Sequence, residues 1–179
     1  MSTPATQHLD DDGARDADTP YEDGARPLYS AAVVNIGGTS GRVWAEGGPS
    51  LPTASPFDTD RPTGSNGSSE VGADPEQLLG MAWSTCLNAT LEVVLAEAGI
   101  EARCTVRVDV DLHREPSGAG YRFVPRAVAA VEGMSPDQAR PHVAAAHARC
   151  PISKLLTGVP GAPAHPPVQV AEFSAPAPR

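Results

Sequence analysis

The segment between Asp74 and Gly99 constrains the fold more than any other part of the chain. Asp74, Pro75 and Gln77 are the residue types preferred at a helix N-cap, at the first helical position and in a capping box. Gly99 suits the position just past a helix C-terminus. The large apolar residues between these ends are Leu78, Leu79, Met81, Trp83, Cys86, Leu87, Leu91, Val93, Val94 and Leu95. They cover nearly every side of the predicted helix, so it belongs in a core or at an oligomer interface.

The other predicted elements place this helix in an α+β fold. Strands are expected over 28–36, 42–46, 103–113, 121–131 and 168–173, and further helices over 135–149 and 151–158. Residues 103–113 alternate between apolar and polar, which is typical of a half-buried strand. Pro141 is expected to kink or delay the first turns of the second helix. The order of elements and their short links predict an antiparallel sheet rather than a parallel array.

The chain of 179 residues is long enough for one domain with a hydrophobic core. We expect a disordered acidic tail over 1–27, one domain over 28–173 and a flexible tail over 174–179. The first tail holds seven of the acidic residues against two arginines, and the net charge of the chain is −9. It is either an acidic interaction arm or a solubilising extension. Residues 48–72 read as loop, with a flexible insertion over 64–69. Basic residues do not cluster, so no nucleic-acid partner is expected.

The sequence also bears on compartment. We expect no membrane-spanning segment, because no apolar run reaches the roughly 18 residues that a bilayer requires. The N-terminus is acidic and polar, unlike a secretory signal, and a cytoplasmic location is therefore expected. Three cysteines in that compartment favour reduced, reactive thiols over a structural disulfide framework.

The cysteines are the candidate reactive groups. Cys86 and Cys150 lie too far apart in sequence for a Cys-x-x-Cys motif, and no histidine has metal-ligand spacing with them. A cysteine inside an apolar helix, like Cys86, is by itself more typical of core packing. Cys150 precedes Pro151, so a helix that begins there would place the thiol at its N-cap and favour the thiolate. Cys104 lies on the apolar face of a strand and reads as a core residue.

Three motifs resemble those of the OsmC/Ohr family. Asp-Pro-Glu-Gln-Leu at 74–78 and Ser-Thr-Cys at 84–86 resemble the helix that carries the family's first cysteine. Cys-Pro-Ile-Ser at 150–153 resembles its second cysteine motif. Leu-Tyr-Ser-Ala at 28–31, followed by glycines and an arginine over 37–42, is similar to the first hairpin of Ohr. The resemblance extends to residue 173, and two cysteine motifs at the right separation make it specific.

The resemblance implies a role for each cysteine. Cys86 would be the peroxidatic cysteine and Cys150 the resolving one. A Cys86 thiolate would attack a peroxide oxygen and become a sulfenic acid, which would then condense with Cys150 to a disulfide. Glu76 matches the family's glutamate, which orients an activating arginine.

The activating arginine is where the chain departs from the family. Ohr carries its arginine directly after the paired glycines, and here Thr39 holds that position. OsmC takes its arginine from the loop before the Pro-Glu motif, where Arg61 is the candidate. Arg42 is the alternative, and we favour Arg61.

The resemblance also implies an assembly. Glu76 and Cys86 are ten residues apart on one helix, which separates them by about 15 Å along its axis. A second chain must therefore supply the glutamate. This agrees with the family's intertwined homodimer, in which antiparallel sheets wrap around two central helices.

The implied activity is the reduction of organic hydroperoxides to alcohols, with a lipoyl-type dithiol as reductant. No metal or bound organic cofactor is required. Leu79, Trp83 and Leu87 suit an alkyl peroxide better than hydrogen peroxide. Two alternatives remain open: a non-catalytic member that binds a hydrophobic ligand, and a redox sensor whose disulfide a partner protein reads.

Overall fold

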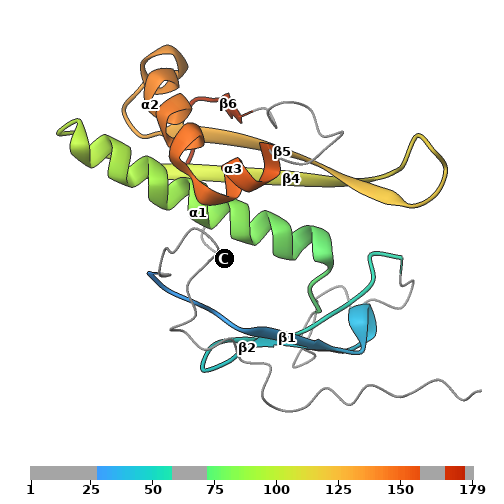
Figure 1. Ribbon diagram of the computed structural model, residues 1–179. Helices are drawn as coiled ribbons and strands as arrows, with labels where there is room; N and C mark the ends of the chain where they lie inside the picture. The colour runs from blue at the N-terminus through green and yellow to red at the C-terminus, as the bar shows by residue number, and fades with distance from the viewer. Residues whose placement is uncertain (1–27, 58–71, 158–167, 176–179) are drawn as a thin grey trace, which may run out of the picture. The chain divides into compact units, whose positions relative to one another are not determined.

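A computed structural model describes residues 28–57, 72–157 and 168–175 (Figure 1). The chain divides into two units, Met1–Ala73 and Asp74–Arg179. The predicted tail over 1–27, the insertion over 64–69 and Arg61 lie outside the described residues. Each unit is described by itself below.

The first unit contains a small antiparallel sheet. Its strands are β1 (Val33–Ile36), β2 (Arg42–Ala45) and β3 (Ser50–Pro52), in the order β1-β2-β3. A 3₁₀ turn, η1 (Gly38–Ser40), joins the first two strands. A Cβ at Gly41 would lie 1.8 Å from the Ile36 carbonyl oxygen, so only glycine fits this turn. β1 is shorter than predicted, and β3 lies in a segment that was expected to be loop.

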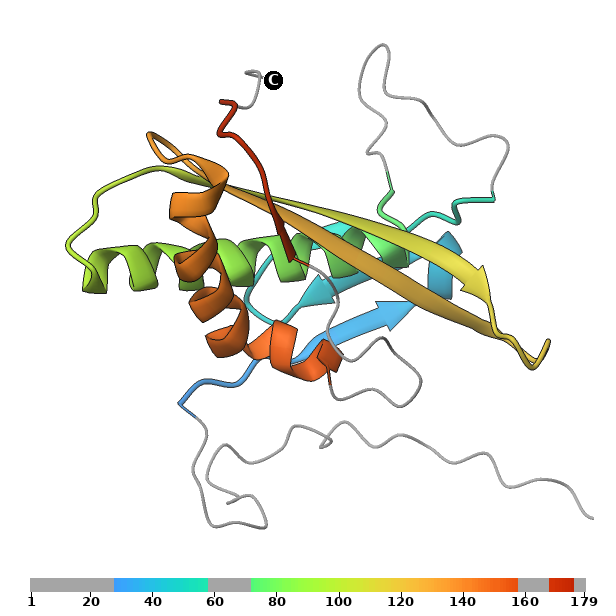
Figure 2. The same ribbon diagram turned by 90° about the horizontal axis from the view of Figure 1, so that it is seen from above.

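The second unit contains three helices and a three-stranded sheet (Figures 1 and 2). Its elements are α1 (Pro75–Glu97), β4 (Cys104–Arg114), β5 (Tyr121–Val131), α2 (Pro136–Arg149), α3 (Pro151–Thr157) and β6 (Val168–Val170). The elements of this unit follow the predicted order of helix, two strands, two helices and a strand.

Helix α1 begins with the predicted capping box. The Gln77 backbone N–H donates to Asp74 Oδ1 at 2.7 Å, and the Asp74 N–H donates to Gln77 Oε1 at 3.1 Å. Gly99 follows the helix with φ of +72°, as a C′ glycine should. The side chains that α1 buries form one stripe: Trp83, Leu87, Leu91, Val94 and Leu95. The opposite side is open, and Met81 and Val93 are about half exposed, at 54% and 49%.

With 23 residues, α1 is long and apolar enough to cross a membrane by length and composition alone, contrary to the expectation that no segment is. A core helix passes the same test. The buried stripe of α1 packs on the sheet of its own unit, as such a helix does.

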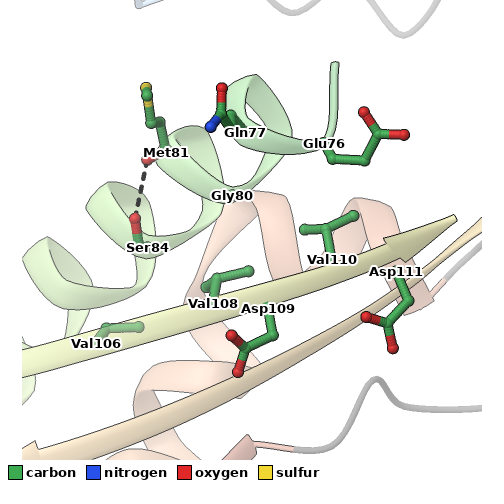
Figure 3. Close-up of a pocket in the computed structure, with 10 residues that line it drawn as sticks. All are labelled: Glu76, Gln77, Gly80, Met81, Ser84, Val106, Val108, Asp109, Val110 and Asp111. Carbon is green, nitrogen blue, oxygen red and sulfur yellow. Dashed lines mark hydrogen bonds between the residues drawn. The ribbon is translucent and has the colours of Figure 1, made fainter. Parts of the chain in front are cut away.

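Strands β4 and β5 form a long antiparallel hairpin whose inner face covers α1. Cys104 pairs with Val131 at one end and Arg114 with Tyr121 at the other. Figure 3 shows Val106, Val108 and Val110 pointing from β4 toward α1, while Asp109 and Asp111 point away. This confirms the predicted alternation.

The third strand of this sheet corrects the antiparallel expectation. β6 pairs in parallel with β5, with Val168 opposite Ala127 and Val170 opposite Ala129. The chain returns to the sheet through α2 and α3, and such a long helical connection is what a parallel pair requires. β6 also ends at Val170 rather than at the predicted Phe173.

Helix α2 begins with a second capping box, in which the Ser135 N–H donates to Gln138 Oε1 at 2.9 Å. Pro141 lies inside the helix and is exposed, and α2 nevertheless starts at Pro136, so the predicted delay is wrong. Proline removes one backbone donor here, and the capping box satisfies the first turn. The buried residues of α2 are small or branched: Ala139, Val143 and Ala146. They bring α2 against α1, and Cys150, which follows α2, belongs to the same core.

Candidate functional site

Two cysteines from distant parts of the sequence meet beside the core of the second unit. Cys86 lies in the middle of α1, and Cys150 lies between α2 and α3. Their Sγ atoms are 3.3 Å apart, and both thiols are free. A disulfide bond is about 2.05 Å long, so a modest movement would join the sulfurs. The Cys150 side chain is fully buried, whereas Cys86 is only half-buried.

Cys150 holds the predicted position at the start of a helix. α2 ends at Arg149, and the Lys154 N–H donates to the Cys150 carbonyl oxygen at 3.0 Å as the first bond of α3. The Ser153 N–H points at Cys150 Sγ, with 3.5 Å between nitrogen and sulfur. The sulfur therefore takes the place of a capping oxygen.

The two thiols have opposite electrostatic environments. Burial raises the pKa of Cys86, and the Ile152 N–H only partly offsets this, while Cys150 raises the pKa further through a hydrogen bond and its charge. Burial also acts to raise the pKa of Cys150. Donors outweigh it, so the Cys150 pKa is lowered; they are the Ser153 hydroxyl and N–H, the Cys86 thiol and the Ile152 N–H. Among the described residues no lysine or arginine contributes to either pKa.

A buried hydrogen bond next to Cys150 was not anticipated from the sequence. Trp83 Nε1 donates to Ser153 Oγ at 2.9 Å, and both side chains are buried. The His147 ring lies against the Trp83 ring, with 6.5 Å between centroids. Ser153 belongs to the second cysteine motif, which is the one sequence signal that could have drawn attention to it. Trp83 and Leu87 are fully buried, so the expectation that they face an alkyl substrate is not met in this structure.

Glu76 lies in the first turn of α1, away from the cysteines. It lines a cleft of about 480 Å³ between α1 and β4, together with Gly80, Val108 and others shown in Figure 3. The Glu76 Oε2 atom is buried and has no hydrogen-bond partner within the described part of the chain. Cys86 does not line this cleft, and it lies about 15 Å further along the continuous helix. The structure therefore does not bring Glu76 and Cys86 of one chain together.

The remaining candidates belong to other parts of the chain. Arg42 is in β2 and Thr39 in η1, both in the first unit, and Arg61 is outside the described residues. Cys104 starts β4 and packs against the core, and burial, then the charge of Glu92, raises its pKa. The described residues hold no group of three histidine, cysteine, aspartate or glutamate side chains that could bind a metal ion.

Comparison with known proteins gives a consistent result. The family profile described as OsmC-like protein matches residues 65–161. The organic hydroperoxide resistance protein OhrB of Bacillus subtilis is 28% identical over 131 residues, which cover 73% of this chain and 92% of that protein. The organic hydroperoxide resistance protein-like 2 of Staphylococcus epidermidis is also 28% identical, over 75% of this chain and 92% of its own.

Solved structures agree with the sequence matches. The crystal structure of Bacillus subtilis OhrB superimposes with a TM-score of 0.64 at 26% identity, covering 82% of this chain and 98% of the other. A Lactobacillus casei protein of known structure has the same TM-score at 32% identity, over 83% of this chain and 92% of its own.

Proposed function

This chain belongs to the OsmC-like protein family, and on that premise we propose that it is a thiol-dependent peroxidase for organic hydroperoxides. The observation that carries the proposal is the 3.3 Å separation of Cys86 Sγ and Cys150 Sγ. The curated relatives named as organic hydroperoxide resistance proteins support the class of substrate.

The proposed cycle has two chemical steps in each turnover of peroxide. The Cys86 thiolate attacks the outer peroxide oxygen, the O–O bond breaks, and the alcohol leaves with a proton. Cys86 is then a sulfenic acid. Cys150 attacks its sulfur, water leaves, and a Cys86–Cys150 disulfide forms. The peroxide is reduced by two electrons, and the thiol pair is oxidised by two. A dithiol reductant of the lipoyl type restores both thiols.

Activation of Cys86 requires a group that the described surroundings of this thiol do not contain. Because burial raises the Cys86 pKa, a cation must approach the sulfur to favour the thiolate at neutral pH. We propose Arg61 for this role, with Arg42 as the alternative, and a Glu76 carboxylate to orient the guanidinium. Such a triad needs Glu76 from a second chain, since about 15 Å separates the two residues on one helix.

We therefore propose a homodimer in which two α1 helices meet. The open side of α1 supports this arrangement, because it presents Met81, Ala89 and Val93 to solvent at helical spacing. In a dimer the same contact would bury these side chains and bring the second Glu76 toward Cys86. A cytoplasmic location fits a pair of free thiols.

Rapid mixing of the reduced protein with cumene hydroperoxide tests the proposal. Cys86 should be oxidised within a second, and two of the three thiols should disappear as the disulfide forms. Cys86→Ser should abolish the reaction, and Cys150→Ser should leave Cys86 open to overoxidation. If Cys86 survives the peroxide, the protein is a ligand-binding member of the family. If it reacts only over minutes, a redox sensor is the better description.

Arginine variants test the activation step separately. Arg61→Ala should slow the oxidation of Cys86 by roughly 10²-fold or more, as expected when a thiolate-stabilising charge is removed. Arg42→Ala is the matched variant. An unchanged rate in Arg61→Ala, with a loss in Arg42→Ala, would move the activating role to Arg42.

A further inference from the structure

The hydrogen bond between Trp83 and Ser153 determines how the Ser153 hydroxyl can act. An indole N–H only donates, so Ser153 Oγ must accept the 2.9 Å bond from Trp83 Nε1. A hydroxyl that accepts keeps its own O–H for another partner. Cys150 Sγ is available as that partner, because the Ser153 N–H already lies 3.5 Å from it and the Ser153 hydroxyl acts to lower the pKa of this thiol.

Ser153 therefore offers Cys150 two donors. Its N–H lies 3.5 Å from the sulfur, and its hydroxyl, which accepts from Trp83 Nε1, keeps its O–H to donate toward the same sulfur. Ser153 is 1% exposed and Trp83 is fully buried, so water does not compete for either bond. Burial strengthens a hydrogen bond to a charged sulfur. The donors around Cys150 therefore favour its thiolate against the effect of burial.

The two sulfurs also differ in their access to solvent, and here Cys86 is the more open one. Cys150 has no exposed surface, while Cys86 is partly open to solvent. Thiol–disulfide exchange needs an attacking thiolate to reach one sulfur and the other sulfur to leave as a stabilised thiolate. Access selects Cys86 for attack, and the donors of Ser153 select Cys150 as the leaving group.

We propose that Ser153, held in place by Trp83, is a positioning residue that directs the reducing dithiol to Cys86 and makes Cys150 the departing thiolate. This inference rests on the proposed Cys86–Cys150 disulfide. The direction of the thiol pKa values agrees with it. Burial and then the Ser153 donors act on Cys150, and their balance lowers its pKa, whereas burial raises that of Cys86.

The electron balance of the step is simple. A thiolate of the dithiol attacks Cys86 Sγ, a new S–S bond forms, and the Cys86–Cys150 bond breaks. Cys150 leaves as a thiolate with the electron pair of that bond, and this thiolate accepts a hydrogen bond from the Ser153 hydroxyl. The second thiol of the reductant then attacks the mixed disulfide and releases Cys86. The reductant becomes a cyclic disulfide, and the protein gains two electrons and two protons.

A trapping experiment identifies the attacked sulfur directly. The full chain is oxidised with diamide, so that the disulfide forms without a peroxide, and glutathione is added as a monothiol that cannot complete the second step. Iodoacetamide then blocks free thiols, and peptide mass spectrometry locates the adduct. We expect glutathione on Cys86 and the alkyl group on Cys150. Glutathione on Cys150, or no Cys86–Cys150 disulfide after diamide, would overturn the proposal.

Variants separate a positioning role from a structural one. Ser153→Ala should slow reduction by roughly threefold to thirtyfold, since it removes a donor to the leaving thiolate. Ser153→Thr keeps the hydroxyl and should restore most of the rate. Thr157→Ala is the matched control, because it removes a hydroxyl that bonds to Lys154 on the same helix. Equal rates in Ser153→Ala and Thr157→Ala would contradict the inference.

If the Ser153→Ala chain folds poorly, the pH dependence of Cys150 alkylation provides a second measurement. In the Cys86→Ser background, the pH midpoint for alkylation of Cys150 should rise when Trp83 is changed to Phe, because the hydroxyl loses the partner that aims it. The other titratable group against this network is His147, which touches the Trp83 ring. His147→Gln should therefore shift the Cys150 alkylation midpoint less than Trp83→Phe does. A Trp83→Phe chain with the same midpoint as its parent would contradict the role of Trp83. A chain that forms the adduct on Cys86 but ignores cumene hydroperoxide would refute the peroxidase and leave this inference standing.

Discussion

Trp83 Nε1 donates a hydrogen bond to Ser153 Oγ at 2.9 Å, although 70 residues separate the two in sequence. The bond joins α1, which carries Cys86, to α3, which directly follows Cys150. It therefore holds together the two elements that must stay in register for the sulfurs to meet.

Removing this bond should weaken the fold. Trp83→Phe leaves a buried hydroxyl short of a partner and a small cavity, so we expect a loss of about 2–4 kcal/mol in the free energy of unfolding. Urea unfolding followed by circular dichroism measures it. Trp44→Phe is the control, because Trp44 is only half-buried in β2. Similar losses in both variants would argue against a special role for the bond. A double-mutant cycle with Ser153→Ala should show coupling of about 1 kcal/mol.

The pKa values of Cys86 and Cys150 should be shifted in opposite directions from that of an ordinary cysteine. Donors overcome burial at Cys150 and lower its pKa, while burial raises that of Cys86. Iodoacetamide labelling against pH, read peptide by peptide, should give the lower midpoint for Cys150. In Cys150→Ser the Cys86 midpoint should fall, because the hydrogen bond and charge that raise it are gone. A Cys86 midpoint that rises instead would contradict this.

The two pKa shifts also make the stability of the fold depend on pH, in opposite directions for the two cysteines. The Cys150 pKa is lower in the folded chain, so its contribution is present above the unfolded thiol pKa and is lost as pH falls through the folded value. Cys86 does the reverse, and its contribution is lost as pH rises from the ordinary thiol pKa through the raised one. The free energy of unfolding should therefore fall less at alkaline pH in Cys86→Ser than in the parent, as measured by urea unfolding.

Cys104 should take no part in the thiol chemistry. It packs against the core at the start of β4, and its pKa is raised by burial and by Glu92. The reduced chain holds three free thiols. A thiol count after stoichiometric oxidation should leave one in the parent and none in Cys104→Ala. A Cys104→Ala chain that cannot form its disulfide would place Cys104 in the redox machinery.

Oxidation should stabilise the chain. A Cys86–Cys150 bond would close a loop that spans 64 positions, and the chain-entropy relation gives about 4 kcal/mol for a loop of that length. Urea unfolding of the diamide-oxidised and reduced forms measures the difference. An oxidised form that is no more stable would mean that joining the sulfurs distorts α1 or α3.

Gly80 should accept one more methyl group and no more. A Cβ there would lie 3.8–3.9 Å from Val108 and Val110, which is ordinary contact. Gly80→Ala should stabilise the helix by up to about 1 kcal/mol through helix propensity. Gly80→Leu should destabilise by about 1–3 kcal/mol because it overfills the α1–β4 contact. Thermal unfolding separates the two, and a destabilised Gly80→Ala would contradict the close but unstrained packing.

Much of the second unit could be predicted, because its signals are local. Both capping boxes, the alternation in β4 and the start of a helix after Cys150 depend on residues within a few positions of one another. The direction of β6 could not be derived this way, since it depends on the path that α2 and α3 take back to the sheet. Strand β3 was also missed, because three residues are too few for a periodic pattern.

The site shows the same limit. Periodicity alone makes Cys86 a core residue, and only the resemblance to a family with two cysteine motifs singled it out. The sequence cannot show that Ser153 faces Trp83, because that contact exists only once α1 and α3 are packed. Nor could burial of Trp83 and Leu87 be read from a helix that is apolar on all sides.

The capping box at Asp74 also limits how the length of this chain can change. It anchors the start of α1 about three turns before Cys86, so the cysteine's direction depends on the number of residues between them. One inserted residue would rotate Cys86 by about 100° around the helix and away from Cys150. The turn at 116–120 between β4 and β5 carries no such restriction. Natural insertions and deletions should therefore accumulate in that turn and be absent between Asp74 and Cys86.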